Sequence, residues 1–398
     1  QNRTLVHKCA AEVLVASAEI RQGEAGMVAR HLSGAGDYDE ASRWAVRAAL
    51  EASESMQHGT AAKWASNALK WLKGLPDGEE KTTLRLEALR IIRESFKGTS
   101  RCEGLEEALL EEIELAREME MPGRAGMVLQ ILSRLKLFQG KADEAESLCA
   151  EGLAAAAVAG DTELEAALLT EKALQWTRSR TEAIELFKRA YSLFEKTGRV
   201  DAMSKVYNNI GTILISSGNL AGAEPFLNKA LTLVEGTRFP GVKAQALVKL
   251  GILDGMSGRS DSAIEKLQAA LALQESTGER RDQGVTLNNL GKCFIDTGDF
   301  DGAKRVLRQA LMIHRETGSQ VNEGKSLENL GCIYLRDGDL NRARLHLEDS
   351  LRLFEAVRYP YGRISSGAFL GMVEAEAGSI DAAVALYGTV LSITIEMK

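Results

Sequence analysis

The sequence predicts an all-α solenoid built from helical hairpins. Two observations carry this prediction: a motif that returns every 40 residues, and a composition that favours helices. The motif is a leucine or isoleucine followed by glycine, and it occurs at Ile210-Gly211, Leu250-Gly251, Leu290-Gly291, Leu330-Gly331 and Leu370-Gly371. A fixed period between 20 and 50 residues is the signature of a repeat architecture, in which each unit packs only on its neighbours.

The composition agrees with a helical chain and excludes several classes of protein. The 398 residues include only 5 prolines and are rich in alanine, leucine and glutamate, which favours helices. A net charge of −7 argues for solubility and against a nonspecific nucleic-acid surface. No apolar run approaches the ~18 residues that a membrane span needs, and the charged N-terminus does not resemble a signal peptide. The scattered cysteines, without a C-x-x-C pair, indicate reduced, buried thiols of a cytoplasmic protein (Cys9, Cys102, Cys149, Cys293 and Cys332).

One unit of the repeat, residues 285–317, shows why the pattern favours a hairpin. Its first half carries a helical apolar stripe and ends at Gly298, which suits a left-handed C-terminal cap. Asp299 is then expected to cap the second helix. Because Gly291 has no Cβ, a neighbouring helix can approach it closely. A single hairpin cannot bury its apolar face, but stacked copies bury it against each other.

The spacing of these positions resembles the tetratricopeptide repeat. A glycine follows each register glycine after seven residues, an alanine after five more, and leucines return in step (Gly298, Ala303, Leu307, Ala310 and Leu311 in the unit above). The resemblance covers residues 201–398 as five regular units, in a 40-residue form similar to kinesin light chains and bacterial signalling ATPases. It implies a right-handed α-solenoid of tetratricopeptide hairpins, about nine in all.

The N-terminal half follows the same plan less regularly. We expect two helices within 4–32, broken near 22–23, and then helices at 39–56, 61–72, 81–96, 104–119, 124–138, 142–159, 161–176 and 181–196. Leu75-Pro76-Asp77-Gly78 reads as the clearest linker. The expected organisation is therefore degenerate repeats over 1–76, divergent hairpins over 77–200 and the five regular units over 201–398.

A second resemblance lies near the N-terminus. His31, the triplet Ala35-Gly36-Asp37 and the later Leu75-Pro76-Asp77 resemble the segment that follows the ATPase module in bacterial signal-transduction ATPases with numerous domains. That class includes large LuxR-type regulators and ATPase-coupled adenylate cyclases. The resemblance implies a sensor arm whose nucleotide site lies outside this sequence. The missing initial methionine and the apolar C-terminal helix indicate a piece of a longer protein.

We expect no catalytic residue, metal ligand or cofactor in the chain, and hence no enzyme. Gly324-Lys325-Ser326 looks like the end of a phosphate loop, but Ser319 stands where that loop needs glycine, and no strand precedes it. The five histidines show no metal-binding spacing. The carboxylate-rich stretch 103–120 reads as a solvated helix face, with a patch for a basic partner as the alternative. Its carboxylates are Glu106, Glu107, Glu111, Glu112 and Glu114.

The candidate binding site is the concave face, which the first helix of each hairpin lines in the resembled family. Counted from the register glycines, the partner-binding residues are Lys205, Asn208, Asn209, Thr212, Gln245, Val285, Asn288, Asn289, Lys292, Lys325, Asn329 and Arg336. A carboxamide both donates and accepts hydrogen bonds, so a ladder of asparagines can hold the backbone of an extended peptide. The alternative is that these asparagines cap or bridge neighbouring helices.

These observations predict a non-catalytic sensor arm of a bacterial signalling ATPase or transcription regulator, which binds a protein or peptide in its groove. Two other functions stay open: a stand-alone adaptor for extended peptides, and a sensor domain for a small-molecule inducer. We expect no nucleic-acid or membrane partner, and we consider self-association through the C-terminal helix. The sequence does not identify the ligand.

Overall fold

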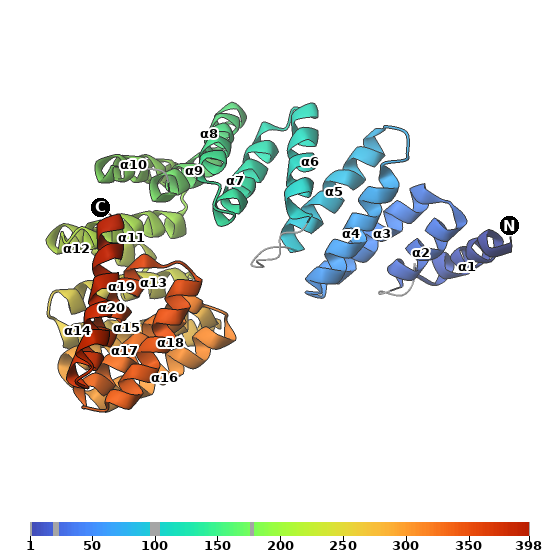
Figure 1. Cartoon of the computed structure of the whole chain (residues 1–398). Helices are drawn as coiled ribbons and strands as arrows, with labels where there is room; N and C mark the ends of the chain where they lie inside the picture. Colours follow the sequence, from blue (N-terminus) through green and yellow to red (C-terminus); the bar gives the residue numbers. More distant parts are fainter. Residues whose placement is uncertain (1, 19–23, 96–103, 176–178, 398) are drawn as a thin grey trace. The chain divides into compact units, whose positions relative to one another are not determined.

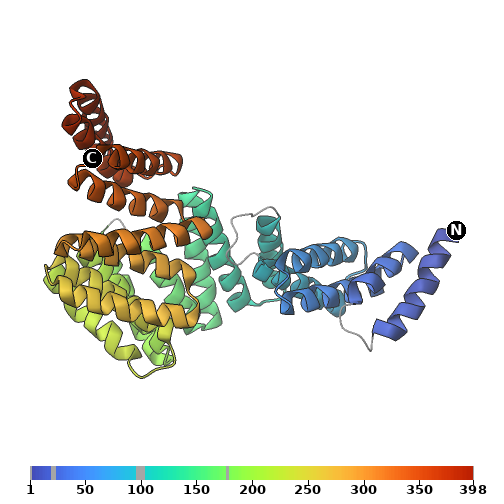
Figure 2. The ribbon, with the colours of Figure 1, turned by 90° about the horizontal axis from the view of Figure 1, so that it is seen from below.

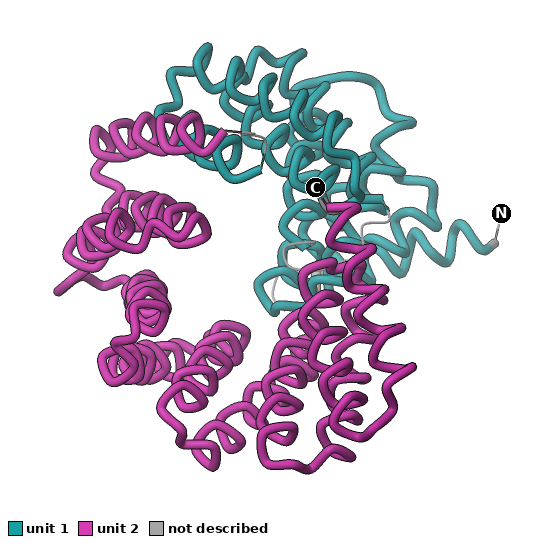
Figure 3. The backbone as a smooth tube through the Cα atoms, turned by 60° about the vertical axis from the view of Figure 1, so that its left-hand side comes forward, with its two compact units in different colours: residues 1–177 teal, residues 178–398 magenta. Residues whose placement is uncertain are grey.

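The computed structural model describes residues 2–18, 24–95, 104–175 and 179–397, and all the regular elements in them are α-helices (Figure 1). The fold is an all-α solenoid, as the repeat predicts. The described residues form twenty helices, two more than nine hairpins require. The contacts divide the chain into two compact units, residues 1–177 and 178–398 (Figure 3). This division falls between the expected boundaries at 76/77 and 200/201, which come from periodicity and stay a prediction.

Unit 1 contains the first nine helices, which agree with the sequence-based ranges to within three residues at each end. They are α1 (Asn2–Ala18), α2 (Ala25–Ala35), α3 (Tyr38–Glu54), α4 (His58–Leu72), α5 (Glu79–Ser95), α6 (Leu105–Glu118), α7 (Pro122–Phe138), α8 (Ala142–Ala159) and α9 (Thr162–Gln175). The expected break near 22–23 and Cys102 lie outside the described residues.

Unit 2 contains eleven helices that pack as neighbouring layers (Figure 2). They are α10 (Arg180–Lys196), α11 (Val200–Ser216), α12 (Leu220–Val234), α13 (Pro240–Met256), α14 (Ser260–Thr277), α15 (Arg280–Thr297), α16 (Phe300–Glu316), α17 (Gln320–Arg336), α18 (Leu340–Ala356), α19 (Pro360–Glu376) and α20 (Ile380–Glu396).

Glycine ends the first helix of each regular hairpin, as expected. The residues just past these helices all adopt a positive φ between 75° and 82° (Gly218, Gly258, Gly298, Gly338 and Gly378). A residue with a Cβ would pay about 1–2 kcal/mol in this conformation. Asp299 then caps α16, because its carboxylate accepts a hydrogen bond from the backbone N–H of Gly302 at 2.9 Å. The turn between the two helices is therefore specified by a glycine and an acceptor side chain.

The register glycines sit where two helices touch. A Cβ on Gly291 would lie 2.6 Å from Cγ of Leu307, and one on Gly331 would lie 2.6 Å from Cγ of Leu347. Both leucines are fully buried. The absence of a side chain at these positions therefore sets the spacing of the hairpin, and the leucine of the second helix fills the space over the glycine.

The acidic helix α6 corrects one expectation. Glu112 was expected on a solvated face, but it is fully buried. Its carboxylate pairs with Nε of Arg93 at 3.2 Å and with Nη2 of Arg124 at 2.8 Å. Because α6 packs against both α5 and α7, one side of it must face the interior, and the arginines of those helices neutralise its charge. Glu107 and Glu114 are exposed, as expected.

The remaining chemical features of the described residues are few. Cys149 and Cys293 are buried, as expected, whereas Cys9 is exposed. No group of three or more histidine, cysteine, aspartate or glutamate side chains in the described part of the chain has the arrangement of a metal site. Among the described helices, none combines the length and apolar character needed to cross a membrane.

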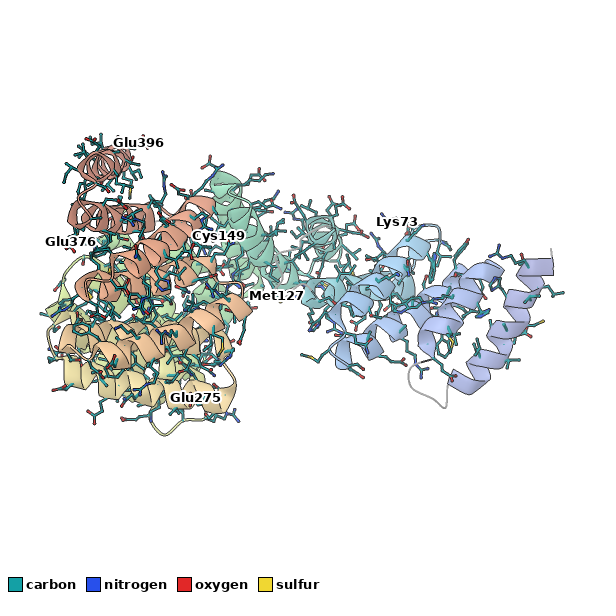
Figure 4. All side chains as sticks on the ribbon, turned by 60° about the horizontal axis from the view of Figure 1, so that its bottom comes forward. Lys73, Met127, Cys149, Glu275, Glu376 and Glu396 are labelled. Atoms are coloured by element: carbon teal, nitrogen blue, oxygen red, sulfur yellow. The ribbon has the colours of Figure 1, made fainter. Side chains whose placement is uncertain are left out.

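The last two helices, which carry the labelled Glu376 and Glu396 in Figure 4, end the second unit. Helix α20 packs on α19 but leaves large apolar side chains exposed. Ile380, Val384, Leu391 and Ile395 are 59%, 64%, 61% and 62% exposed. Their spacing of four, seven and four residues places them on one face of the helix.

Candidate ligand-binding groove

The first helices α11, α13 and α15 lie next to one another and share a polar face. A pocket of about 430 Å³ opens on this face, and we call it the Lys249 pocket. Its lining consists of Lys205, Asn208, Asn209, Gln245, Val248, Lys249, Gln274, Asp282, Val285 and Thr286. All but Gln274, which belongs to α14, come from the three first helices.

The structure brings several of the predicted binding residues together at this pocket. Lys205, Asn208, Asn209, Gln245 and Val285 all line it. A second pocket of about 290 Å³, formed by α13, α14 and α15, contains Asn289 and Lys292. Seven of the twelve predicted residues therefore lie at one of two pockets on the first helices. Their role in binding stays a prediction.

The other asparagines contact neighbouring helices. Asn329 of α17 donates through Nδ2 to Oδ1 of Asn288 of α15 at 3.2 Å, and the Ser326 hydroxyl donates to the same oxygen at 3.3 Å. This is the bridging arrangement that the sequence left open as the alternative. Asn289, which lines the second pocket, instead donates to the backbone carbonyl of Val285 at 3.0 Å, within its own helix.

Three further predicted residues also make contacts with the protein itself. The Thr212 hydroxyl donates to the backbone carbonyl of Asn208 at 2.8 Å. The ammonium of Lys325 lies 5.6 Å from the centre of the Tyr359 ring, and the guanidinium of Arg336 lies 4.5 Å from the centre of the Phe300 ring. Both are cation–π contacts, which hold long side chains in place at modest energy. These residues line neither of the two pockets.

The Lys249 pocket contains buried polar atoms that have no hydrogen-bond partner among the described residues. They are Oδ1 and Nδ2 of Asn208, Oε1 of Gln274 and Oγ1 of Thr286. The three side chains belong to residues that are 5%, 1% and 0% exposed. An unpaired buried polar group costs about 1–3 kcal/mol, so such groups are rare in folded proteins. Three side chains with such atoms line this one pocket.

Lys249 adds an uncompensated charge to the same pocket. It is half-buried, and no ion pair of its ammonium occurs among the described residues. Burial lowers the pKa of Lys249 below the ordinary lysine value. Sequence reasoning missed this residue, although a signal was present. Lys249 stands two residues before Gly251, the same register as Asn209 before Gly211 and Asn289 before Gly291.

Comparison with known families agrees with this geometry. The family model for the tetratricopeptide repeat matches residues 201–276, 242–316 and 282–356. Residues 201–356 are tetratricopeptide repeats. These repeats include α11 to α18 almost completely, so the Lys249 pocket lies within the first three units of the tetratricopeptide array. A comparison with curated protein sequences gives no match.

Three solved structures resemble this chain in fold. The quorum sensor NprR from B. thuringiensis, in its apo form, shares 15% identity at a TM-score of 0.62, over 90% of this chain and 100% of that one. A Rap protein complexed with Competence and Sporulation Factor shares 14% identity at 0.59, over 90% and 98% of the two chains. The Signal Transduction ATPase with Numerous Domains from Pyrococcus horikoshii, with a tetratricopeptide repeat sensor, shares 14% at 0.54, over 84% of this chain and 54% of that one. At this identity the likeness establishes the fold.

Proposed function

We propose that the chain is a non-catalytic sensor arm of a bacterial signalling ATPase or transcription regulator in the cytoplasm. In this proposal the tetratricopeptide array binds a protein or peptide along its first helices. The observation that carries the proposal is that the accessible polar side chains of Lys205, Asn209 and Gln245 gather at one pocket on the face of α11, α13 and α15. The likeness to a tetratricopeptide sensor of a signalling ATPase, and to a Rap protein complexed with a factor, supports it.

The chemistry of this face suits an extended peptide. Asn209 and Gln245 carry side-chain amides that line the pocket, and each amide can donate and accept a hydrogen bond. An extended peptide offers one N–H and one C=O per residue, so a row of amides matches its backbone. Lys205, exposed at the rim, favours an acidic or carboxylate-bearing partner.

A displayed library of random peptides selected on the purified chain tests the proposal. Selected peptides are then titrated by calorimetry against the wild type and the double variant Asn209→Ala with Gln245→Ala. Loss of two hydrogen bonds of ~0.5–1.5 kcal/mol each should weaken binding by roughly 5- to 150-fold. The control is Glu265→Ala with Gln268→Ala, two exposed residues of α14 outside both pockets. If the control pair weakens binding and the groove pair does not, the ligand binds elsewhere and the proposal is wrong.

A stand-alone adaptor for extended peptides would use the same groove, so peptide binding does not separate it from a sensor arm. The coding region upstream of Gln1 does. A phosphate-loop motif encoded after a strand supports the sensor arm, and a start codon next to Gln1 supports the adaptor.

The exposed apolar face of α20 supports a second proposal, self-association. Ile380, Val384, Leu391 and Ile395 form a stripe that water contacts directly. Burial against a second copy would remove this apolar surface from water, at about 25 cal/mol per Å². Sedimentation velocity should show a concentration-dependent oligomer that Val384→Glu with Leu391→Glu converts to a monomer. A wild-type chain that stays monomeric at every concentration contradicts this proposal.

A further inference from the structure

The Lys249 pocket contains a lysine ammonium without an ion pair and buried polar atoms without hydrogen-bond partners. Lys249 has no ion-pair partner among the described residues, and the lining carries two lysines, Lys205 and Lys249, against one carboxylate, Asp282, so the pocket favours a further negative charge. Asn208 and Thr286 offer further donors, Nδ2 and the hydroxyl. Gln274 offers an acceptor, Oε1, and Asn208 offers another, Oδ1. A ligand that satisfies the pocket must therefore combine an anionic acceptor with a neighbouring donor.

We propose that the Lys249 pocket binds a small carboxylic acid that carries an N–H or O–H group next to its carboxylate, that is, an α-amino or α-hydroxy acid. The carboxylate accepts from Lys249, Asn208 and Thr286, which can fill its lone-pair positions. The adjacent N–H or O–H donates to Oε1 of Gln274 or Oδ1 of Asn208. Asp282 also lines the pocket and supplies a negative charge for the ammonium of an amino acid.

The depth of the unpaired groups favours a compact ligand over a passing peptide chain. Gln274 belongs to α14, in the layer of second helices, and only 1% of its surface is exposed. Thr286 is fully buried on α15. Lys205 and Gln245 are exposed, so a peptide that runs along the groove can contact them without reaching Gln274 or Thr286. The pocket volume of about 430 Å³ falls at the lower end of the range for small-molecule sites.

Two other buried polar side chains on α11 and α13 do have hydrogen-bond partners. Asp254, buried on the same helix α13, accepts hydrogen bonds from Arg259 at 2.6 Å, Ser262 at 2.7 Å and Lys266 at 2.6 Å. The buried Ser204 of α11 donates to the carbonyl of Ala230 at 2.8 Å. Asp254 and Ser204 therefore have partners outside the pocket, whereas three side chains that line the pocket do not. Unpartnered buried atoms also occur in unit 2 at His314 and His346, but these two residues line neither of the two pockets.

This inference shares the groove with the proposed function but goes beyond it, because it names a different ligand class. The two can fail separately. If peptides bind the groove and carboxylates have no effect, the proposed function survives and this inference fails. If carboxylates bind and no peptide does, the chain is a small-molecule sensor.

Thermal unfolding of the full chain with a panel of soluble probes tests the inference. The panel contains the free α-amino acids, lactate, malate and their amide analogues, and acetylated tripeptides with either a free or an amidated C-terminus. We expect at least one free acid to raise Tm, and its amide analogue to have no effect. A response to free acids places the ligand among small molecules, whereas a response confined to tripeptides with a free C-terminus identifies a chain end.

Two variants make the test specific. Lys249→Met should weaken the affinity for the responding acid by roughly 10- to 100-fold in calorimetry, because a charged hydrogen bond is lost. Lys243→Met, the same change on the same helix but outside the pocket, should leave the affinity unchanged.

The unfolding temperatures of the two variants without ligand give a second test, which stays valid if Lys249→Met alters folding. Since Lys249 is a half-buried cation with no ion-pair partner, Lys249→Met should unfold at a higher temperature than Lys243→Met. If it unfolds at a lower temperature, Lys249 has a structural role and the inference is overturned. The inference is equally overturned if no acid shifts the Tm of the wild type.

Discussion

The register glycines allow a quantitative test of how the tetratricopeptide array is packed, and Gly251→Ala is the sharpest case. A Cβ at this position would lie 2.8 Å from Cγ of Leu267, 3.1 Å from its Cδ2 and 3.2 Å from the carbonyl oxygen of Ala263. Leu267 is fully buried, and the carbonyl belongs to the backbone of α14, so neither can move away cheaply. Overpacking of this kind costs about 1–3 kcal/mol. Alanine recovers about 1 kcal/mol of helix propensity, so the net loss should be roughly 0–2 kcal/mol.

Gly388→Ala is the matched control, because Gly388 lies inside α20 and nothing surrounds its missing Cβ within 4 Å. Here only the helix propensity acts, and it should stabilise the chain by up to ~1 kcal/mol. Urea unfolding followed by circular dichroism should therefore separate the two midpoints, with Gly251→Ala below and Gly388→Ala above the wild type. If both variants are stabilised equally, the helix contacts at the register glycines do not limit the packing, and the reasoning about hairpin spacing is refuted.

Three further predictions concern other parts of the chain. Arg358 adopts φ of 52°, whereas Gly198, Gly278 and Gly318 fill similar turns after second helices, so Arg358→Gly should raise the stability of the chain by ~1 kcal/mol in urea unfolding. Glu112→Gln should lower the Tm strongly, because a broken buried pair costs ~3–5 kcal/mol, whereas the exposed Glu114→Gln should not change it measurably. Burial lowers the pKa of His314 below 6.5, so the unfolded chain binds more protons in the window below pH 6.5, and the wild type should lose stability as the pH falls through it. His314→Leu should flatten this dependence in urea titrations at pH 7.5 and 5.5, and an unchanged slope would show that other groups cause it.

The repeat period alone was sufficient to predict most of the fold. It placed Gly218 and Gly298 at the ends of helices, where both have a positive φ, and it placed Ala303 and Leu307 in the core, where both are fully buried. These positions are local consequences of one hairpin, and the hairpin is written five times. The expectation that the first helix of each pair lines the groove came from the resemblance to the tetratricopeptide repeat and not from the period.

The period could not predict what depends on how helices are rotated against each other. Asn288 and Asn329 occupy neighbouring registers, yet they bond to each other, because α15 and α17 approach at that point. Glu112 looked like part of a solvated face, but its burial depends on arginines from α5 and α7. No sequence pattern pointed to Gln274. What distinguishes it is a buried side-chain oxygen without a hydrogen-bond partner, and only the three-dimensional packing shows this.

The distribution of unpaired groups connects the stability of the array to its function. Elsewhere in unit 2 the half-buried carboxylate of Glu328 on α17 accepts hydrogen bonds from both Ser365 and Ser366 of α19 at 2.5 Å, although burial still raises its pKa. A helical array of this kind can therefore satisfy a polar group away from water with serines from a neighbouring helix. Asn208 has no such partner for either of its side-chain atoms. A leucine at this position would avoid the cost of ~1–3 kcal/mol for an unpaired buried group. An amide at this position costs stability that the packing of the hairpins does not require, and the ligand proposed above would supply the partners that Asn208 lacks.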